Sequence, residues 1–281
     1  MKLRRKIIIS VLAITVAGAI ALQFKSLRQL VSDGARQIKR VEGFYRYNSG
    51  WPLRGTPDLK NLEGRLAEKG LKLGAPLFMR IFKTESELEI WMKDGHEFKH
   101  FATYPICNWS GRLGPKLKQG DHQSPEGFYT VTRGQLNPNS RWHRSFNLGY
   151  PNVFDRAHKR TGDYLMVHGG CGSVGCYAMT NPVIDEIWRI ITTSLKSGQP
   201  RFHVHVYPFR MTRWNVAFHS DRNWIGFWQD LKAGYDLFEQ SHIPPEVSVC
   251  GQRYQVRPGS PGSLGRSAIT KRCTAPNLSR L

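Results

Sequence analysis

LMVHGGCGSVGCYAMT, residues 165–180, joins a histidine at the end of an apolar run to a glycine-rich loop that holds two cysteines. A cysteine thiol is a weak nucleophile until a neighbouring base removes its proton, and His168 on an adjacent turn can be that base. The glycines let the backbone approach a substrate closely, and N–H groups beside a cysteine can stabilise a tetrahedral oxyanion. This stretch therefore favours acyl transfer through a thioester.

Two stretches upstream extend the pattern, QSPEGFY at residues 123–129 and SFNLGYPN at residues 145–152. Four further motifs follow them along the chain: Asp155–Ala157, Arg160–Gly162, His168-Gly169 and Ser173-Val174-Gly175-Cys176. Together these motifs resemble the L,D-transpeptidase (YkuD-type) catalytic domain, in its YafK-like branch. The resemblance covers Leu77–Phe209 and implies a mainly-β (α+β) fold, a β-sandwich-like domain with a short helix.

The resemblance implies a cysteine acyltransferase with Cys176 as nucleophile and His168 as its base. The substrate it implies is a peptidoglycan stem tetrapeptide, attacked at the L-centre of diaminopimelate with loss of D-alanine. An amine then takes the acyl group, and neither a metal nor an organic cofactor is needed. Backbone at the His-Gly turn would orient the histidine, and the loop would line the oxyanion site; the residues expected in these roles are Gly169, Gly170, Ser173, Gly175 and the amide of Cys176.

The chain also departs from the family pattern. Val174 replaces a second histidine that many members carry, and Ala178 stands where an arginine is expected to fix the substrate. Arg156 or Arg160 is our candidate for the missing cation, and Tyr150 for a wall of the substrate groove. Because the YafK-like branch includes an enzyme that releases peptidoglycan-bound lipoprotein, hydrolysis of an L,D-peptide bond is the alternative to transfer.

Two readings of another class remain open. His168, Cys171 and Cys176 could join His203 or His205 in a zinc-binding module. Alternatively, the chain is a catalytically inactive wall-binding protein. Cys171 lacks the Ser-x-Gly context, which favours a structural or accessory role over that of nucleophile. The alternation of residues 202–206 places both later histidines on one face of a strand, where we expect solvent or groove exposure.

The charge and the N-terminus indicate an exported protein with an anionic partner. The chain has 41 Lys and Arg against 21 Asp and Glu, a formal net charge of +20. A basic start, Met1–Lys6, precedes the uncharged run Ile7–Leu22, which is typical of a signal peptide or a retained signal anchor over residues 1–23. In either case we expect the rest in the periplasm or cell envelope, with peptidoglycan stem peptides as partner, a lipoprotein lysine as a further acceptor, and no nucleic acid. Membrane contact would come from the N-terminal segment if it stays uncleaved.

The remaining sequence predicts appendages around one domain. Residues 24–76 form a basic connecting region with a helix near Pro57–Lys69, residues 77–209 the catalytic domain, residues 210–249 a helical extension, and residues 250–281 a basic disordered tail. A further helix is expected from Pro182 to Gly198, with Asn181 as N-cap. Strands are expected at Leu77–Lys83, Leu88–Lys93, Phe98–Ile106, Gly127–Thr132, Tyr164–His168 and Arg201–Phe209.

The chain has an odd number of cysteines, so they cannot all be paired in disulfides. Five cysteines suit an exported protein, and Cys250 could pair with Cys273. An odd number leaves at least one thiol free.

Overall fold

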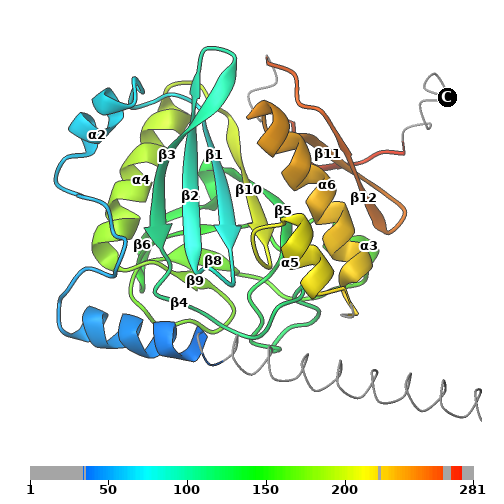
Figure 1. The fold of residues 1–281 in the computed structure, drawn as a ribbon, viewed down its shortest axis with the longest axis horizontal. Coiled ribbons are helices and arrows are strands. Elements are labelled where there is room, and N and C mark those ends of the chain that lie inside the picture. Colours follow the sequence, from blue (N-terminus) through cyan, green and yellow to red (C-terminus); the bar gives the residue numbers. More distant parts are fainter. Residues whose placement is uncertain (1–33, 35, 221–222, 262–266, 274–281) are drawn as a thin grey trace, which may run out of the picture. The chain divides into compact units, whose positions relative to one another are not determined.

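The computed structural model describes residues 34, 36–220, 223–261 and 267–273 (Figure 1). The predicted signal segment, residues 1–23, lies outside the described residues. No helix in the described ranges is both long enough and apolar enough to cross a membrane. The contacts divide the chain into two units, Met1–Tyr45 and Arg46–Leu281. In the first, residues 36–45 are helical, and the second holds all the sheets.

The first five-stranded sheet has the order β3-β2-β1-β10-β5. Its strands are β1 (Leu77–Phe82), β2 (Glu87–Asp94), β3 (Glu97–Pro105), β5 (Gly127–Thr132) and β10 (Arg201–Tyr207). β1 and β10 run parallel although more than a hundred residues separate them, and the other neighbours are antiparallel. All six positions of β1 are buried, as expected for a central strand covered on both faces.

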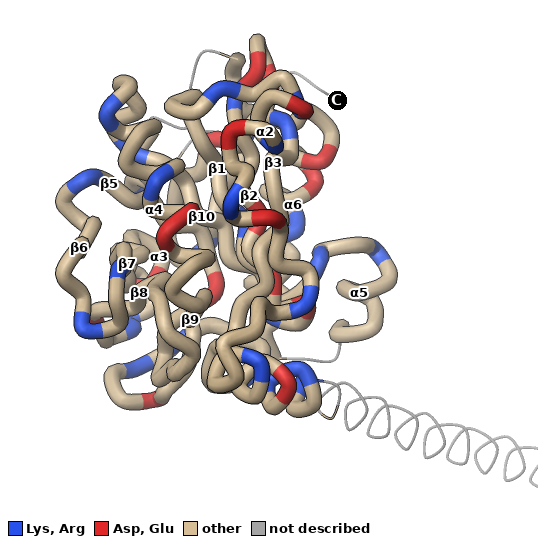
Figure 2. The backbone as a smooth tube through the Cα atoms, turned by 90° about the vertical axis from the view of Figure 1, so that its left-hand side faces the viewer, with Lys and Arg blue, Asp and Glu red and all other residues tan. Residues whose placement is uncertain are grey.

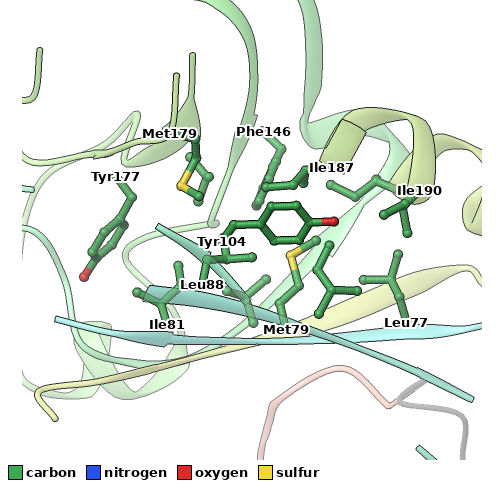
Figure 3. Close-up of a cluster of buried hydrophobic side chains, with 14 of the residues drawn as sticks. Leu77, Met79, Ile81, Leu88, Tyr104, Phe146, Tyr177, Met179, Ile187 and Ile190 are labelled. Carbon is green, nitrogen blue, oxygen red and sulfur yellow. The ribbon is translucent and has the colours of Figure 1, made fainter. Parts of the chain in front are cut away.

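The second five-stranded sheet has the order β4-β9-β8-β7-β6. Its strands are β4 (Asn108–Trp109), β6 (Leu136–Ser140), β7 (His143–Asn147), β8 (Met166–His168) and β9 (Tyr177–Ala178). The main core lies between the two sheets and helix α4 (Asn181–Lys196). Figure 3 shows side chains from all three meeting there, among them Met79, Tyr104, Phe146 and Ile187. The predicted mainly-β (α+β) architecture is confirmed.

Most of the predicted elements are present in the structure. All six predicted strands occur, within a few residues at each end. The helix expected near Pro57–Lys69 is present as α2 (Leu62–Glu68), which begins later than predicted and buries Leu62 and Leu66. The other helices are α3 (Val153–Ala157), α5 (Arg213–Phe218), α6 (Ile225–Ser241) and the short 3-10 turn η1 (Arg133–Gln135). One cap differs from the prediction: Thr180 is the N-cap of α4, and Asn181 is its first helical residue.

The C-terminal region is ordered further than the sequence indicated. Residues 246–249 are not helical and residues 250–257 are not a disordered tail, because β11 (Glu246–Cys250) and β12 (Arg253–Arg257) form a sheet with β13 (Thr270–Lys271). Val247, Val249 and Tyr254 supply a buried face, and a disulfide joins Cys250 to Cys273. This face packs with α6 in a second core that also takes in Phe82 and Phe128 of the first sheet. The predicted tail is therefore wrong for these residues, since their apolar alternation outweighs a composition rich in Pro, Gly and Ser.

The expectation that His203 and His205 are exposed is also wrong. Their side chains lie on the face of β10 opposite the main core, and their exposed fractions are 2% and 0%. His205 packs against Phe78 and Phe128, with ring centroids 4.8 and 4.4 Å away. Burial, reinforced by the positive charges of His203 and Arg80, holds the pKa of His205 well below its usual value.

We therefore expect stability to fall in mild acid because of His205. The unfolded chain takes up a proton on this residue near pH 6.5, whereas the folded chain does not. Above pH 6.5, His205 should not lower the free energy of unfolding. Below pH 6.5, protonation of His205 in the unfolded chain should lower that free energy by at most about 1.4 kcal/mol per pH unit. Urea unfolding of wild type and His205→Gln between pH 7.5 and 5 measures it. The variant should show a shallower decline, and equal pH slopes would contradict the assignment.

Candidate active site

Cys176 is the single free thiol among the five cysteines, all of which lie in the described residues. Cys171 is joined to Cys107, 64 residues away along the chain. Its sulfur is thus held in a bond between the residue before β4 and the glycine-rich loop and cannot act as the nucleophile. The structure agrees with the structural role that the sequence favoured for Cys171.

The parallel pairing of β8 and β9 brings Cys176 and His168 to one face. Val167 is paired with Tyr177 and His168 with Ala178, so Cys176 stands opposite Met166, whose N–H donates to Cys176 Sγ at 3.4 Å. Val167 and Tyr177 are fully buried in the main core. Because side chains alternate along strands, His168 and Cys176 both point away from that core. They are diagonal neighbours on the opposite face of the sheet.

A backbone carbonyl fixes the orientation of His168. Nδ1 lies 2.6 Å from the carbonyl oxygen of Gly169, which fits a tautomer with the proton on Nδ1 and a lone pair on Nε2. Of the two glycines suggested by the sequence, Gly169 makes this contact. The Gly170 N–H donates instead to Asn181 Oδ1 at 2.7 Å. A Cβ at Gly169 would lie 2.8 Å from the backbone carbonyl oxygen of Trp142, so any other residue after the histidine would force the backbone to shift.

Trp142, in the turn between β6 and β7, covers the imidazole. The two ring centroids are 5.7 Å apart with planes tilted by 30°. His168 is 2% exposed, whereas Trp142 is 39% exposed and Tyr164, whose carbonyl oxygen lies 3.7 Å from Cys176 Sγ, is 70% exposed. These exposed aromatic side chains border the site on two sides.

Burial keeps both reacting groups neutral near pH 7. It raises the pKa of the Cys176 thiol, opposed by the hydrogen bond from Met166 and the positive charge of Lys116. It lowers the pKa of His168, opposed by the hydrogen bond to Gly169. A neutral thiol beside a neutral imidazole fits a base that takes the proton during attack, rather than an ion pair formed beforehand.

Three serine hydroxyls hold the backbone around the nucleophile. Ser173 Oγ donates to the Cys176 carbonyl oxygen at 2.7 Å and accepts the Cys176 N–H at 3.2 Å. Ser124 Oγ donates to the same carbonyl oxygen at 2.9 Å. Ser110 Oγ accepts the N–H of Gly175, which has a φ of +102°. The amides of Gly175 and Cys176 are thus engaged within the protein, and their part in an oxyanion site stays a prediction.

Behind these serines lies a buried ion pair. Lys83 Nζ is 2.9 Å from Glu126 Oε1, and both side chains are 0% exposed. Lys83 also donates to the Ser124 carbonyl oxygen at 3.1 Å, and Trp228 Nε1 of α6 donates to Glu126 Oε2 at 2.8 Å. The pair therefore ties the loop behind Cys176 both to the end of β1 and to the C-terminal helix.

Removing one partner of this pair should destabilise the whole domain. Glu126→Gln leaves Lys83 as a buried charge without its counter-ion, a change that costs about 3–5 kcal/mol in comparable sites. The double variant Glu126→Gln/Lys83→Met removes both charges and should recover part of that loss. Urea unfolding of the two variants beside wild type measures the difference, and an unchanged midpoint for Glu126→Gln would contradict it.

The polar side chains of the predicted substrate-binding residues are engaged in contacts within the protein. Arg160 is buried with its Nη1 2.8 Å from Asp155 Oδ1, and Arg156 donates to the Pro151 carbonyl oxygen. Tyr150 is 4% exposed and donates to the Lys116 carbonyl oxygen at 3.2 Å. Lys116 is the cation whose field reaches Cys176, and its Nζ is 2.5 Å from Asp121 Oδ1. A substrate role for Tyr150, Arg156 or Arg160 stays a prediction.

The donors of the suggested zinc site are not assembled. Cys171 is in a disulfide, and His203 and His205 lie on the face of β10 opposite the main core. Within the described ranges, no three His, Cys, Asp or Glu side chains come together as metal ligands.

Sequence reasoning missed Trp142, Ser110 and the contact of Asn181. Trp142 and Ser110 lie outside the helices and strands, and the sequence around them matches no functional motif, so it did not indicate a role in the site. Asn181 was noticed, but as a cap. Its position beside Pro182 is typical of a helix start, and only the folded chain shows its side chain turned toward Gly170.

The comparisons with known proteins agree with these motifs. The family model of the L,D-transpeptidase catalytic domain, YkuD, matches residues 79–206. The chain is 51% identical over 184 residues to the "Putative L,D-transpeptidase YafK" of Escherichia coli strain K12, which covers 66% of this chain and 75% of that protein. The same protein of Escherichia coli O157:H7 gives the same values.

Two solved structures are similar at lower identity. The helical cell shape determining protein Pgp2 from Campylobacter jejuni is 17% identical with a TM-score of 0.39, over 68% of this chain and 80% of that one. Bd1075 of Bdellovibrio bacteriovorus is 14% identical with a TM-score of 0.35, over 62% and 76% of the two chains.

Proposed function

The chain belongs to the L,D-transpeptidase (YkuD) family, and on that premise we propose that it transfers the acyl group of a peptidoglycan stem tetrapeptide through a thioester on Cys176. The acceptor is an amine, and the process is the building or remodelling of the cell wall. The family acts on peptidoglycan peptides, which supports this substrate class. The observation that carries the proposal is the placement of the single free thiol on the same face as a histidine whose Nδ1 is held by Gly169.

In the first half-reaction, His168 Nε2 takes the thiol proton as Cys176 Sγ attacks the carbonyl carbon at the L-centre of diaminopimelate. The tetrahedral intermediate then breaks its C–N bond. His168 returns the proton to the departing D-alanine nitrogen, which leaves the acyl group on sulfur. The serine contacts to the Cys176 backbone support this step, because they hold the nucleophile in place before substrate arrives.

In the second half-reaction an amine attacks the thioester carbonyl. A C–N bond forms, the C–S bond breaks, and His168 moves the amine proton to the leaving sulfur. Water in place of the amine would give an L,D-peptide hydrolase that trims stem peptides or releases a bound lipoprotein. Hydrolysis is the second candidate because Ala178 stands at the position of the family's substrate-fixing arginine.

Purified muropeptides distinguish the two outcomes. We expect incubation with tetrapeptide muropeptides to give cross-linked dimers and free D-alanine, identified by mass spectrometry. Loss of D-alanine with tripeptide as the sole product would show a hydrolase. If neither product appears and Cys176 carries no acyl group, the proposed chemistry is wrong.

We also propose that the protein works in the periplasm or cell envelope. The basic start and the uncharged run over residues 7–22 support export, and peptidoglycan is found outside the cytoplasm. Residues 1–30 fused to a reporter that is active only after export should give signal. A reporter that works only in the cytoplasm would contradict this placement, and with it membrane contact or a lipoprotein partner.

A further inference from the structure

One cavity in the described part of the chain has no residue of the Cys176 loop in its lining. It measures about 780 Å³, within the range of pockets that hold small molecules or peptide side chains. One wall is the segment 52–62, which precedes the family-matched residues 79–206, and the other is the first half of α4. Figure 1 shows this segment running beside α4 toward α2. We call this cavity the α4 cleft.

The lining of the α4 cleft combines an apolar floor with charged residues of both signs. The floor comes from Leu59, Leu62 and three prolines. The charged lining residues of the cleft are Asp58, Asp185, Lys60 and Arg189 at the surface and Glu186, which is buried. Figure 2 shows both acidic and basic positions near α2 and α4, in a chain whose overall charge is strongly positive.

Two polar groups in the α4 cleft have capacity for a ligand. Thr56 Oγ1 is buried without a hydrogen-bond partner. The exposed Asp58 has one side-chain oxygen that accepts the Lys60 N–H at 3.1 Å. In contrast, Arg65 bonds to Glu186, and Arg189 bonds to Glu63. A ligand that offers a donor to Thr56 and a positive charge to Asp58 would therefore fit the cleft.

The α4 cleft adjoins the active site on the side of the histidine. Its lining residue Pro182 follows Asn181, whose Oδ1 holds the N–H of Gly170. Its lining residue Asp185 accepts from His143 Nε2 at 2.7 Å, and His143 follows the Trp142 that covers His168. Lys116 and Tyr150 lie elsewhere, near the loop that ends at Tyr164.

We propose that the α4 cleft binds the acceptor: a peptide with two amines, held through its apolar part on the floor and one protonated amine at Asp58, while the second, uncharged amine attacks the thioester. This inference rests on the proposed function and deepens it. The acceptor amine must give its proton to His168 Nε2 as it attacks the thioester, so it has to arrive from the histidine side. The lining residues Pro182 and Asp185 place the cleft on that side, and the exposed Asp58 suits a cation.

The test measures how an acyl-enzyme divides between amine and water. A stem tetrapeptide serves as donor, with leucyl-lysine amide, which has two amines, as acceptor probe and glycinamide as a small amine that cannot fill the cleft. Mass spectrometry gives the ratio of amide to hydrolysis product. Because the ratio counts only acyl groups already on Cys176, it does not depend on how fast a variant acylates.

Asp58→Lys should lower the ratio for the lysine probe about fivefold to tenfold, and Asp58→Asn about twofold, in line with the loss of an attractive charge. Thr56→Val should also lower it, because the donor contact is lost. The matched control Asp236→Lys makes the same charge change on α6, outside the cleft, and should leave the ratio as in wild type. With glycinamide, all these variants should behave alike.

Normal acylation with unchanged ratios in the Asp58 and Thr56 variants would overturn this inference and leave the proposed function standing. So would hydrolysis as the sole fate of the wild-type acyl-enzyme. A glycan fragment without peptide that lowers the ratio in wild type but not in Asp58→Lys would show a saccharide site instead. No acyl group on Cys176 at all would overturn both proposals.

Discussion

Cys176→Ala should abolish turnover of tetrapeptide muropeptides, with a loss on the order of 10⁴-fold or more. No other sulfur can replace it, since the remaining four cysteines are paired in disulfides. The fold should survive, because Cys176 Sγ makes only weak contacts, with the Met166 N–H and the Tyr164 carbonyl oxygen. Product formation, melting temperature and intact mass after exposure to a carbapenem, a β-lactam that acylates thiols, are the measurements.

A matched control removes cysteines without removing the nucleophile. The double variant Cys107→Ala/Cys171→Ala loses the disulfide next to the site and should be less stable by about 2–4 kcal/mol. It should nevertheless still acquire the acyl group on Cys176. Turnover that persists in Cys176→Ala, or a thioester that maps to another residue, would refute the nucleophile assignment.

His168→Gln should slow acylation of Cys176 by about 10²–10⁴-fold near neutral pH, the usual contribution of a positioned base. The direction of the pH dependence follows from the two shifted groups. In wild type the imidazole is a competent base above its pKa, which lies below the usual value, so the rate should reach its plateau before pH 7. In the variant only the thiolate reacts, and burial places the pKa of that thiol above its ordinary value.

The variant's rate should therefore climb about tenfold per pH unit through the neutral range, and the gap to wild type should narrow in alkali. Rates of carbapenem acylation from pH 5 to 10 give both profiles, and the melting temperature distinguishes a catalytic from a packing role. Wild-type rates in His168→Gln would exclude it as the base. Equal losses of rate at every pH, together with a lower melting temperature, would instead indicate that the histidine only packs the end of β8.

Local sequence predicted the parts of the site that are continuous in the chain. His168 and Cys176 are eight residues apart in one motif, and the strands that hold them are short and apolar, so their role followed from residue types alone. Ser110 and Trp142 reach the site from turns far away in sequence, and no local pattern encodes that approach. The same limit applies to the Lys83–Glu126 pair, whose two charges look like ordinary surface residues until the chain is folded.

The errors share one physical cause, which is tertiary burial outweighing composition. His203 and His205 alternate with valines as a half-exposed strand would, yet Phe78 and Phe128 pack against His205, and the Ser267 carbonyl oxygen contacts His203 Nε2. The C-terminal residues carry the Gly, Pro and charge of a flexible tail, yet Tyr254 stacks on Phe154 with ring centroids 4.1 Å apart and accepts from Asn152 Nδ2 at 2.9 Å. In both cases the partner that covers the surface is distant along the chain.

The bond from Trp228 to Glu126 has a consequence for how this branch can evolve and be dissected. A fragment cut at residue 206, where the family match ends, would strip the buried carboxylate of its indole partner and expose the apolar surfaces of Phe82 and Phe128 to water. Such a fragment should aggregate rather than behave as an independent module. By the same reasoning, a related protein without α6 would have to replace both Glu126 and Lys83. We therefore expect related proteins to have α6 and this ion pair together, or neither.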